Sequence, residues 1–537
     1  MTSKTSDSKA SAPRYAALDI GSNSVHMIIA ETDGRGGLRV IDREREMLKL
    51  GSGTFTTHRI REDRYAETVQ VLGHFATLAR RHDVAEILAV ATSAVREAEN
   101  GPQLLAEIRT HTGIDVRLIE GQEEARLIWR GVTHSVDLRK RRGLIIDVGG
   151  GSVELIVGDA RSVQVMDSLP LGVQRLKDFF GTSDPLPSTT RDELQRHVTL
   201  AASAAIAKAQ RAGFEVTILT SGTLLALGLA AIRARGADPW AALDGQVVST
   251  RELKDLSTQL LAMDQPERLR VPGIDERRAD TMHLASALIV TLLELLKVEQ
   301  VLLSNATLRQ GLILDRLALA GEPPPLDIRR DSIGELLATL SGAAFSEAAS
   351  SERAATSFEC RHGEHVASLA LQLFDLTATA HKLGALEREL CGYAAQLSDI
   401  GRNINYMGHE HLAYHLTRGA GLRGFTTREV DIMGLAARYH RKGNPKPRHH
   451  HYAELDPNDR QIVKVIAGII RIADALDRGR TGVVTRMTGN VGRRKIELEA
   501  ESQTDVALEI WAANRQTQLL GRAIDREISV TRARAAT

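Results

Sequence analysis

The sequence predicts an α/β protein with a duplicated, two-lobed amino-terminal half, followed by an all-α domain and a small α+β appendage. Three observations predict this class. Short β-rich runs alternate with helical periodicity from residue 14 onward, a nine-residue motif occurs twice, and the chain becomes almost wholly helical after a proline run at 323–325. Such alternation is typical of sheets covered by helices. The 537 residues are also too many for one hydrophobic core.

The elements expected in the first half follow from apolar patterning. Strands are predicted at residues 14–20, 25–31, 38–50, 86–91 and 116–119, and helices at 62–82, 102–112 and 122–134. A second glycine-rich hairpin begins at Leu144. The most apolar helix, at about 284–298, is shorter than a bilayer span and carries Glu294, so we expect it to be buried.

Five segments are therefore expected along the chain. They are a disordered tail at 1–13, lobe I at 14–143, lobe II at 144–322, a helical domain at 326–483 and a small α+β domain at 484–537. The tail is rich in Ser, Thr, Lys and Ala and has no apolar core, which argues against a signal peptide.

Composition narrows the functional class. A formal net charge of +1 argues against a bulk nucleic-acid binder, although a local anion-binding groove remains compatible with it. The only cysteines, Cys360 and Cys391, do not have a paired metal-ligand spacing, and so few thiols fit a reducing compartment. We expect a soluble, cytoplasmic protein with no membrane-spanning segment.

The motif that occurs twice is the most useful feature. Residues 18–26 read LDIGSNSVH and residues 146–154 read IDVGGGSVE, so Asp, Gly, Ser and Val recur at the same positions. Two such units in successive halves predict two like domains that face each other across a cleft. The copies differ at their last position, where His26 is replaced by Glu154.

Each copy can bind an anion. In a glycine-rich turn between strands, successive backbone N–H groups converge on one point and form an anion-binding nest. Side-chain donors come from Ser22, Asn23, Ser24 and Ser152, and Asp19 and Asp147 stand at strand ends where they can hold a metal near bound phosphates. The alternative, two ordinary hairpins with structural glycines, is disfavoured because both turns carry Asp in register.

Three further clusters carry candidate chemistry. The segment 119–126 (IEGQEEAR) opens a helix with Glu123 and Glu124, one of which can act as general base, and spacing alone leaves open which. After the strand at 86–91, Thr92 and Ser93 offer hydroxyls and Arg96 can clamp a phosphate. The turn that contains Thr223 follows another strand, as phosphate-binding turns do.

Taken together and in order, these motifs resemble those of the exopolyphosphatase/guanosine pentaphosphate phosphohydrolase (Ppx/GppA) family, over roughly residues 14–480. The resemblance implies a duplicated ribonuclease-H-like fold, as in actin and sugar kinases, with the active site between the lobes. It assigns Glu124 as the catalytic carboxylate that activates water, and Asp147 and Glu154 as ligands of Mg²⁺ or Mn²⁺. The phosphate-binding positions that it implies are Gly21, Ser22, Asn23, Arg96, Gly149, Gly150, Gly151 and Ser152.

Two regions depart from the resemblance. Residues 306–311 read ATLRQG where the family often has GLREG, a change expected to affect the lobe interface more than the chemistry. The helical domain resembles HD-type phosphohydrolases, with His365, Asp399, His440 and Asp474 at the expected places. Ser398 replaces one histidine there, and His409, His411 and His415 are not expected to restore it. We therefore expect a degenerate scaffold that binds metal weakly.

The function predicted first is exopolyphosphatase, which releases terminal phosphate from inorganic polyphosphate. Hydrolysis of guanosine pentaphosphate is the closest alternative, because both activities use the same residues. A kinase-like ATPase is disfavoured by the Glu123–Glu124 motif, and a non-catalytic sensor of polyphosphate or guanosine tetraphosphate is disfavoured by the intact carboxylates. A homodimer is expected.

Overall fold

The computed structural model describes residues 12–32, 37–181, 183–236, 242–321, 327–340, 358–402, 404–441 and 443–533. All but the last two residues of the tail predicted at 1–13 lie outside this part of the chain. The chain divides into two compact units, 1–331 and 332–537, and each is described here by itself.

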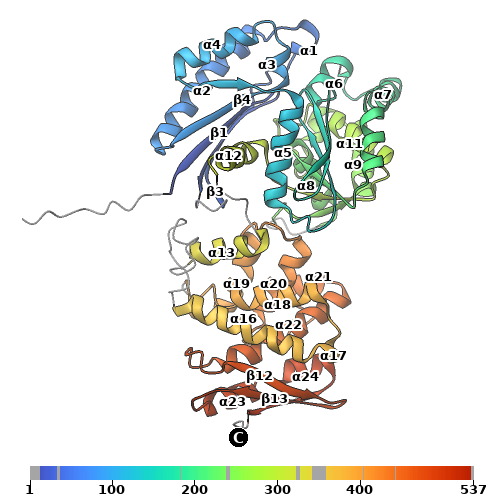
Figure 1. Cartoon of the computed structure of the whole chain (residues 1–537). Helices are drawn as coiled ribbons and strands as arrows, with labels where there is room; N and C mark the ends of the chain where they lie inside the picture. The colour runs from blue at the N-terminus through green and yellow to red at the C-terminus, as the bar shows by residue number, and fades with distance from the viewer. Residues whose placement is uncertain are drawn as a thin grey trace, which may run out of the picture. The chain divides into compact units, whose positions relative to one another are not determined.

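The first lobe of the amino-terminal unit is a mixed five-stranded sheet with helices around it (Figure 1). Its strands are β1 (Arg14–Ile20), β2 (Val25–Thr32), β3 (Leu38–Glu46), β4 (Glu86–Ala91) and β5 (Val116–Leu118). Its helices are α1 (Thr54–Thr57), α2 (Glu62–Arg81), α3 (Ser93–Glu97), α4 (Gly101–Thr112) and α5 (Gly121–Ser135). The order of strands in the sheet is β3-β2-β1-β4-β5.

The second lobe has a six-stranded sheet of order β10-β11-β9-β6-β7-β8. Its strands are β6 (Gly143–Val148), β7 (Val153–Gly158), β8 (Val163–Leu169), β9 (Val216–Thr220), β10 (Val247–Ser249) and β11 (Gln300–Leu303). Its helices are α6 (Val173–Phe180), α7 (Ser188–Ala212), α8 (Gly222–Ala234), α9 (Thr250–Ala262), α10 (Gln265–Arg268) and α11 (Met282–Leu296), followed by α12 (Leu308–Leu319). As predicted, the apolar helix α11 is buried, and it packs against α7 and α9.

The two sheets confirm the predicted α/β duplication. In each, the first strand pairs antiparallel with the second and parallel with the fourth, as β1 does with β2 and β4, and β6 with β7 and β9. The registers also correspond, because Asp19 lies opposite His26 and Asp147 lies opposite Glu154. The motif that occurs twice therefore folds into the same hairpin twice.

Strand β3 ends earlier than the alternation predicts, at Glu46 instead of residue 50. The physical reason is that residues 49–51 bond to the glycine-rich turn of the first lobe instead of to a strand. The N–H of Lys49 donates to Asn23 O (2.9 Å) and the N–H of Gly51 donates to Ser22 O (2.7 Å). These bonds, with Lys49 in the left-handed region at φ 50°, turn the chain out of the sheet.

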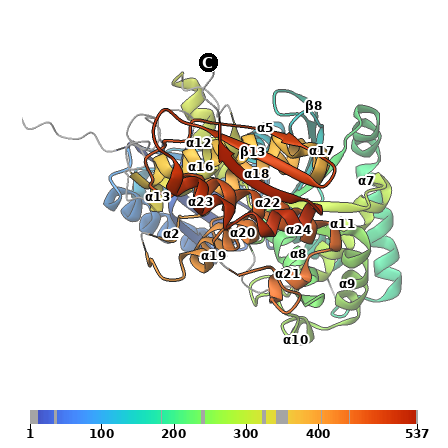
Figure 2. The same cartoon turned by 90° about the horizontal axis from the view of Figure 1, so that it is seen from below.

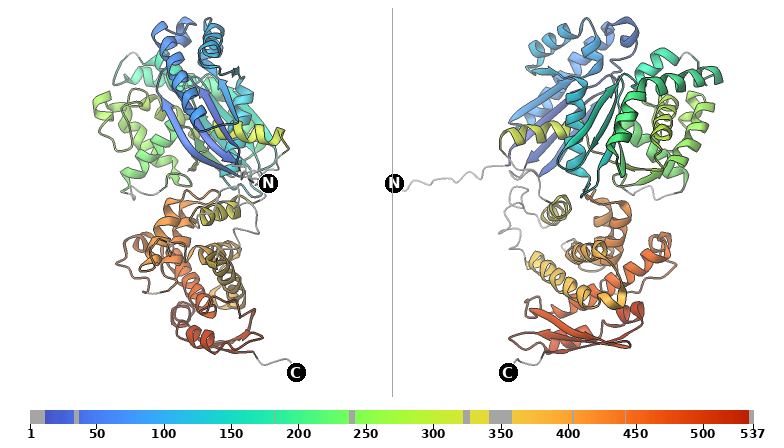
Figure 3. Two further views of the ribbon diagram at one scale, coloured as in Figure 1. Left: turned by 90° about the vertical axis from the view of Figure 1, so that its left-hand side faces the viewer. Right: turned by 45° about the vertical axis from the view of Figure 1, so that its right-hand side comes forward.

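Helix α12 does not stay with the lobe to which its sequence position assigns it. It packs against α5 and also contacts β1 and β2, so residues 308–319 return to the first lobe (Figure 3, right). The approach is close because two glycines face the neighbouring backbone. A Cβ on Gly311 would lie 1.8 Å from Leu127 O, and one on Gly131 would lie 2.4 Å from Thr307 O.

The carboxy-terminal unit consists of helices and one three-stranded sheet of order β12-β13-β14 (Figure 2). Its helices are α16 (Phe358–Leu376), α17 (Ala378–His381), α18 (Ala385–Leu397), α19 (His409–Gly419), α20 (Thr427–Arg438), α21 (His450–Glu454), α22 (Pro457–Leu476), α23 (Ala507–Asn514) and α24 (Gln518–Ile524). Its strands are β12 (Arg486–Val491), β13 (Lys495–Glu501) and β14 (Glu527–Arg532). Helix α13 (Ile328–Leu340) spans the boundary between the units.

The boundary predicted at residues 483/484 does not separate two cores. Ile496 and Leu498 of β13 belong to the same apolar cluster as Leu390 of α18 and Ile466 of α22. The sheet buries its apolar face on the helices, and this packing stabilises a sheet of only three strands. Within the described residues, no helix is long and apolar enough to cross a membrane.

Candidate active site

The two glycine-rich turns meet where the lobes join. A Cβ on Gly150 would lie 2.9 Å from Asn23 N and from Ser22 Cβ, and one on Gly151 would lie 2.2 Å from Ser93 Oγ. Contacts with lobe I, from the turn itself and from Ser93 beside it, thus favour glycine at both positions of lobe II. The predicted cleft is here a direct contact between the two turns.

Donors are available at this contact. Among the described residues, the backbone N–H groups of Asn23, Gly150 and Gly151 donate to no carbonyl or side chain. Ser22 Oγ lies 2.9 Å from Ser93 Oγ and accepts the N–H of Ala94 at 3.2 Å, which ties the turn to the start of α3. An unpaired set of N–H groups in adjacent turns is an anion-binding arrangement.

Four carboxylates from four elements gather beside the turns: Asp19 at the end of β1, Asp147 on β6, Glu154 on β7 and Glu124 in the first turn of α5. Their mutual influence is visible in their pKa values. Burial, and then the neighbouring carboxylates Glu154 and Asp19, raise the pKa of Asp147 well above its usual range. Burial also raises the pKa of Asp19, although Arg309 opposes the rise.

The register of α5 decides which glutamate joins them. Burial, and then the charges of the other three carboxylates, raise the pKa of Glu124 well above its usual range. Glu123 points elsewhere, because its carboxylate pairs with Arg117 and lies 3.9 Å from Arg126. The structure thus separates the two residues that sequence spacing left undecided.

Glu154 is the most buried of the four, with a relative exposure of 1%. Burial raises the pKa of its carboxyl to about 7, although hydrogen bonds from Ser152 and Ser168 oppose the rise. Ser168 Oγ donates to Glu154 Oε1 at 2.8 Å. Nothing in the sequence marks Ser168, on β8, as a site residue.

Two arginines face the carboxylates. Arg309 Nη1 lies 3.3 Å from Asp19 Oδ2, and its charge also opposes the rise in the pKa of Asp147. Arg96 Nη1 donates to Ile119 O at 2.6 Å, just before α5, and its charge acts on Glu124 and Glu154. The residues at 306–311, which the sequence assigns to the lobe interface, therefore also supply a cation to the site.

The carboxylate oxygens of this site suit a hard divalent cation. Asp19 Oδ1, Glu124 Oε2 and Glu154 Oε2 are buried oxygens that find no hydrogen-bond partner among the described residues. Asp147 and Glu154 are direct cross-strand neighbours, a position where like charges destabilise a sheet. Oxygen ligands of this kind suit Mg²⁺ or Mn²⁺.

Of the remaining predicted residues, two lie on lobe I and Thr223 lies on α8 of lobe II. Thr92 is the buried N-cap residue of α3, and Ser24 Oγ lies 2.6 Å from His26 Nε2. Thr223 is buried in the first turn of α8, where the side chain against its turn is Arg278, 2.7 Å from a Cβ on Gly222. No described contact joins Thr223 to the four carboxylates.

The lobes are also held together by side chains around the turns. Asp280 of lobe II accepts hydrogen bonds from Lys49 of lobe I (2.7 Å) and from Lys177 (2.6 Å). Arg175 donates to Gly151 O (2.9 Å) and to Glu97 of lobe I (2.6 Å). These bonds fix the two turns against each other.

In the carboxy-terminal unit the structure corrects the predicted ligand set. The histidine near the acidic residues is His362, with Nε2 3.2 Å from Asp474 and 3.7 Å from Asp399, whereas His365 is one turn farther along α16. His409 was not expected to restore the missing imidazole, yet its Nε2 lies 3.2 Å from Asp399.

Comparison with known proteins now assigns the family. Residues 27–320 match the Ppx/GppA phosphatase family, and residues 349–525 match Ppx/GppA phosphatase, domain III. This chain belongs to the Ppx/GppA phosphatase family. Like the family, it is a hydrolase that acts on phosphoanhydride bonds.

Curated members of the Ppx/GppA family match both units. A guanosine-5'-triphosphate,3'-diphosphate pyrophosphatase of Vibrio vulnificus is 27% identical over 437 residues, 80% of this chain and 81% of that protein. A protein of the same name from Aliivibrio fischeri (strain ATCC 700601 / ES114) is 25% identical over 526 residues, 93% of this chain and 97% of that protein.

Solved Ppx/GppA structures match a little over half of the chain. An exopolyphosphatase from Cytophaga hutchinsonii is 29% identical with a TM-score of 0.54, and the match covers 57% of this chain and 98% of that one. The Aquifex aeolicus family member is 26% identical with a TM-score of 0.50, covering 58% of this chain and 99% of that one.

Proposed function

We propose that this protein hydrolyses the terminal 5′ phosphate of guanosine pentaphosphate, releasing orthophosphate and guanosine tetraphosphate. The observation that carries the reaction type is the convergence of Glu124, Asp19, Asp147 and Glu154 beside two turns with unpaired N–H groups. The choice of substrate rests on the curated relatives, which match up to 93% of the chain and are named for this activity. This order reverses the preference that the sequence alone suggested.

Glu124 is the proposed general base. A carboxylate of ordinary pKa is a weak base at neutral pH, and a catalytic base works best when its pKa lies near the working pH. Burial and the neighbouring carboxylates raise the pKa of Glu124 in that direction. Glu124 would accept a proton from the water that attacks the terminal phosphorus, as the bond to the bridging oxygen breaks.

The turns are proposed to bind the phosphates. The free N–H groups of Asn23, Gly150 and Gly151 would donate hydrogen bonds to phosphate oxygens. They are uncharged donors held in fixed positions, because each turn is packed against the other. Arg96, held by Ile119 O, adds a cation that the developing negative charge would favour. Ser22 and Ser93 offer hydroxyls from the same surface.

Mg²⁺ or Mn²⁺ is the proposed cofactor, held by Asp147 and Glu154, with Asp19 close to Asp147. Such an ion, when bound, withdraws charge from phosphate oxygens. It would also remove the repulsion that now raises the pKa of these carboxyl groups.

The test measures phosphate release from guanosine pentaphosphate and from long-chain polyphosphate side by side with Mg²⁺. We expect a higher kcat/KM for guanosine pentaphosphate, with guanosine tetraphosphate as the nucleotide product. A higher kcat/KM for polyphosphate would overturn the choice of substrate. Failure to release phosphate from either would overturn the reaction type.

Exopolyphosphatase activity is the second candidate. It is favoured by the solved exopolyphosphatase, which is 29% identical over a match that covers 57% of this chain. The same residues would perform the same displacement on a polyphosphate end. Glu124→Gln should abolish whichever activity is found, and Glu123→Gln is its matched control.

A further inference from the structure

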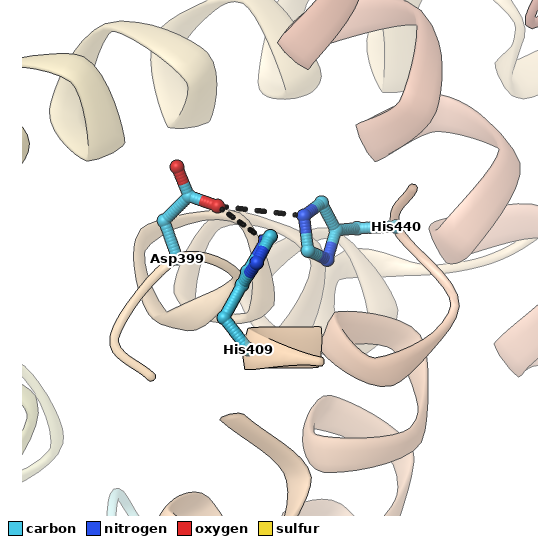
Figure 4. A group of neighbouring side chains, drawn as sticks. All are labelled: Asp399, His409 and His440. Carbon is cyan, nitrogen blue, oxygen red and sulfur yellow. Dashed lines mark ion pairs between the residues drawn. The ribbon is translucent and has the colours of Figure 1, made fainter. Parts of the chain in front are cut away.

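We propose a transition-metal site in the carboxy-terminal unit, formed by Asp399, His409 and His440 and separate from the four-carboxylate site. The three residues come from different parts of the sequence. Asp399 follows α18, His409 begins α19 and His440 follows α20. One atom from each lies within 4.8 Å of the other two, and Figure 4 shows both rings directed at one oxygen of Asp399.

The hydrogen bonds of each ring determine which nitrogen faces the carboxylate as an acceptor. His409 Nδ1 lies 2.9 Å from Tyr406 O, and His440 Nδ1 lies 2.6 Å from Ala437 O. A backbone carbonyl can only accept, so each Nδ1 must carry a hydrogen. In the neutral ring, Nε2 then carries a lone pair, and it is through such a lone pair that imidazole binds metals.

Both lone pairs face an acceptor. His409 Nε2 lies 3.2 Å and His440 Nε2 3.5 Å from Asp399 Oδ1, yet neither nitrogen completes a hydrogen bond within the described part of the chain. Both histidines are 1% exposed. Two buried ring nitrogens without a donor, facing one carboxylate oxygen, leave a desolvation cost that a bound cation would remove.

The other oxygen of Asp399 is already engaged. Asp399 Oδ2 pairs with Arg480 and lies 3.5 Å from Arg402 Nη1. These contacts orient the carboxylate so that Oδ1 points at the two rings, as partners behind a metal ligand usually do. Ser398 takes no part, because its hydroxyl donates to Ala395 O at 2.8 Å.

Protonation of both rings is the competing explanation. Two imidazolium ions would then share one carboxylate oxygen, with their ring centroids 5.4 Å apart and a guanidinium on the same carboxylate. Placing several like charges in a buried space is costly. A metal ion satisfies the same three atoms without that repulsion.

The ligand set selects the kind of ion. Two imidazoles and one carboxylate suit Zn²⁺, Fe²⁺ or Co²⁺, whereas an all-oxygen set suits Mg²⁺ and Ca²⁺. Three protein ligands also leave positions open for water or another oxygen donor. Histidines farther along the chain thus supply the imidazole ligands that Ser398 cannot provide.

The test uses full-length protein stripped with a chelator and titrated with Co²⁺. We expect one high-affinity Co²⁺ per chain, with visible absorption bands typical of nitrogen ligation, and Zn²⁺ should displace it. His409→Gln and His440→Gln should each weaken binding roughly 100-fold or more, since loss of a ligand exceeds the 10–100-fold effect of an outer partner. His450→Gln, in the exposed group His450–His451–Glu454, is the matched control and should bind as wild type.

Asp147→Asn separates this site from the lobe junction, and it should retain the Co²⁺ bands. The Co²⁺ spectrum of the wild-type protein tests nitrogen ligation by itself. Thermal unfolding of the metal-free histidine variants identifies any variant that folds poorly. Absence of the bands in wild-type protein would overturn the proposal. So would equal binding by wild type, His409→Gln and His440→Gln, or loss of binding in His450→Gln or Asp147→Asn.

Discussion

Replacement of Glu124 by Gln tests both the chemistry and the electrostatics of the lobe junction. The side chain keeps its shape but loses its charge and its basicity. Loss of a general base costs about 10²–10⁴-fold in rate, or about 3–5 kcal/mol of activation free energy. We therefore expect kcat to fall by that factor while the Kd of the substrate changes little, because Glu124 contributes no donor to the phosphates.

The same substitution should stabilise the metal-free protein. Glu124 is buried among three other carboxylates, and its folded-state pKa is raised above the unfolded value. A group of this kind destabilises the fold increasingly as pH rises above the unfolded pKa of about 4.3. Gln removes that penalty, so Glu124→Gln should gain on the order of 0.5–2 kcal/mol at pH 8 and little at pH 4.

The assays are single-turnover phosphate release and thermal unfolding in the presence of a chelator at both pH values. Glu123→Gln is the control, because Glu123 pairs with Arg117 on the outside of α5. It should retain most activity and gain no stability. If Glu124→Gln kept a near-normal kcat, or proved less stable than wild type at pH 8, the placement of Glu124 among the carboxylates would be refuted.

Three further predictions concern packing and charge. Gly311→Ala should lower stability by about 1–3 kcal/mol, because the new Cβ would lie 1.8 Å from Leu127 O. The control Gly73→Ala, whose Cβ would have nothing within 4 Å, should raise stability instead. Equal changes in Tm for the two variants would contradict this prediction. Burial lowers the pKa of His283 to about 4 from 6.5. The free energy of unfolding should therefore fall by about 3 kcal/mol between pH 6.5 and 4, because the unfolded chain takes up the proton first. His283→Met should remove this contribution to the pH dependence of stability. Arg309→Met should raise the carboxyl pKa values further and move the acid limb of the pH–rate profile to higher pH; an unmoved limb would exclude Arg309 from the site.

Local patterning explains why much of the first unit could be predicted. Strands β1 and β4 begin and end at the predicted residues, and β2 differs by one. Buried strands in a sheet produce short apolar runs that turns interrupt, so their limits are local. The repeat predicted two like units, and the register of the second hairpin, which the structure shows, makes Asp147 and Glu154 neighbours.

Contacts between distant segments could not be predicted in this way. Arg309 meets Asp19 across 290 residues, and the packing of α12 on α5 and on β1 brings them together. The orientation of α5 likewise chose Glu124 over Glu123, since both stand in the same first turn. In the second unit, the resemblance named His365, whereas the structure places His362, one helical turn earlier on α16, beside Asp474 and Asp399.

By itself, the sequence determined the α/β class, the duplicated hairpin and the two glycine-rich turns proposed to bind phosphate, because each depends on spacing along a short segment. The tertiary structure decided which charges share a site. It joined four carboxylates and Arg309 at the lobe junction, and it brought His409 and His440 to Asp399. Their electrostatics depend on distance and burial, and neither is a property of residues near one another in the chain.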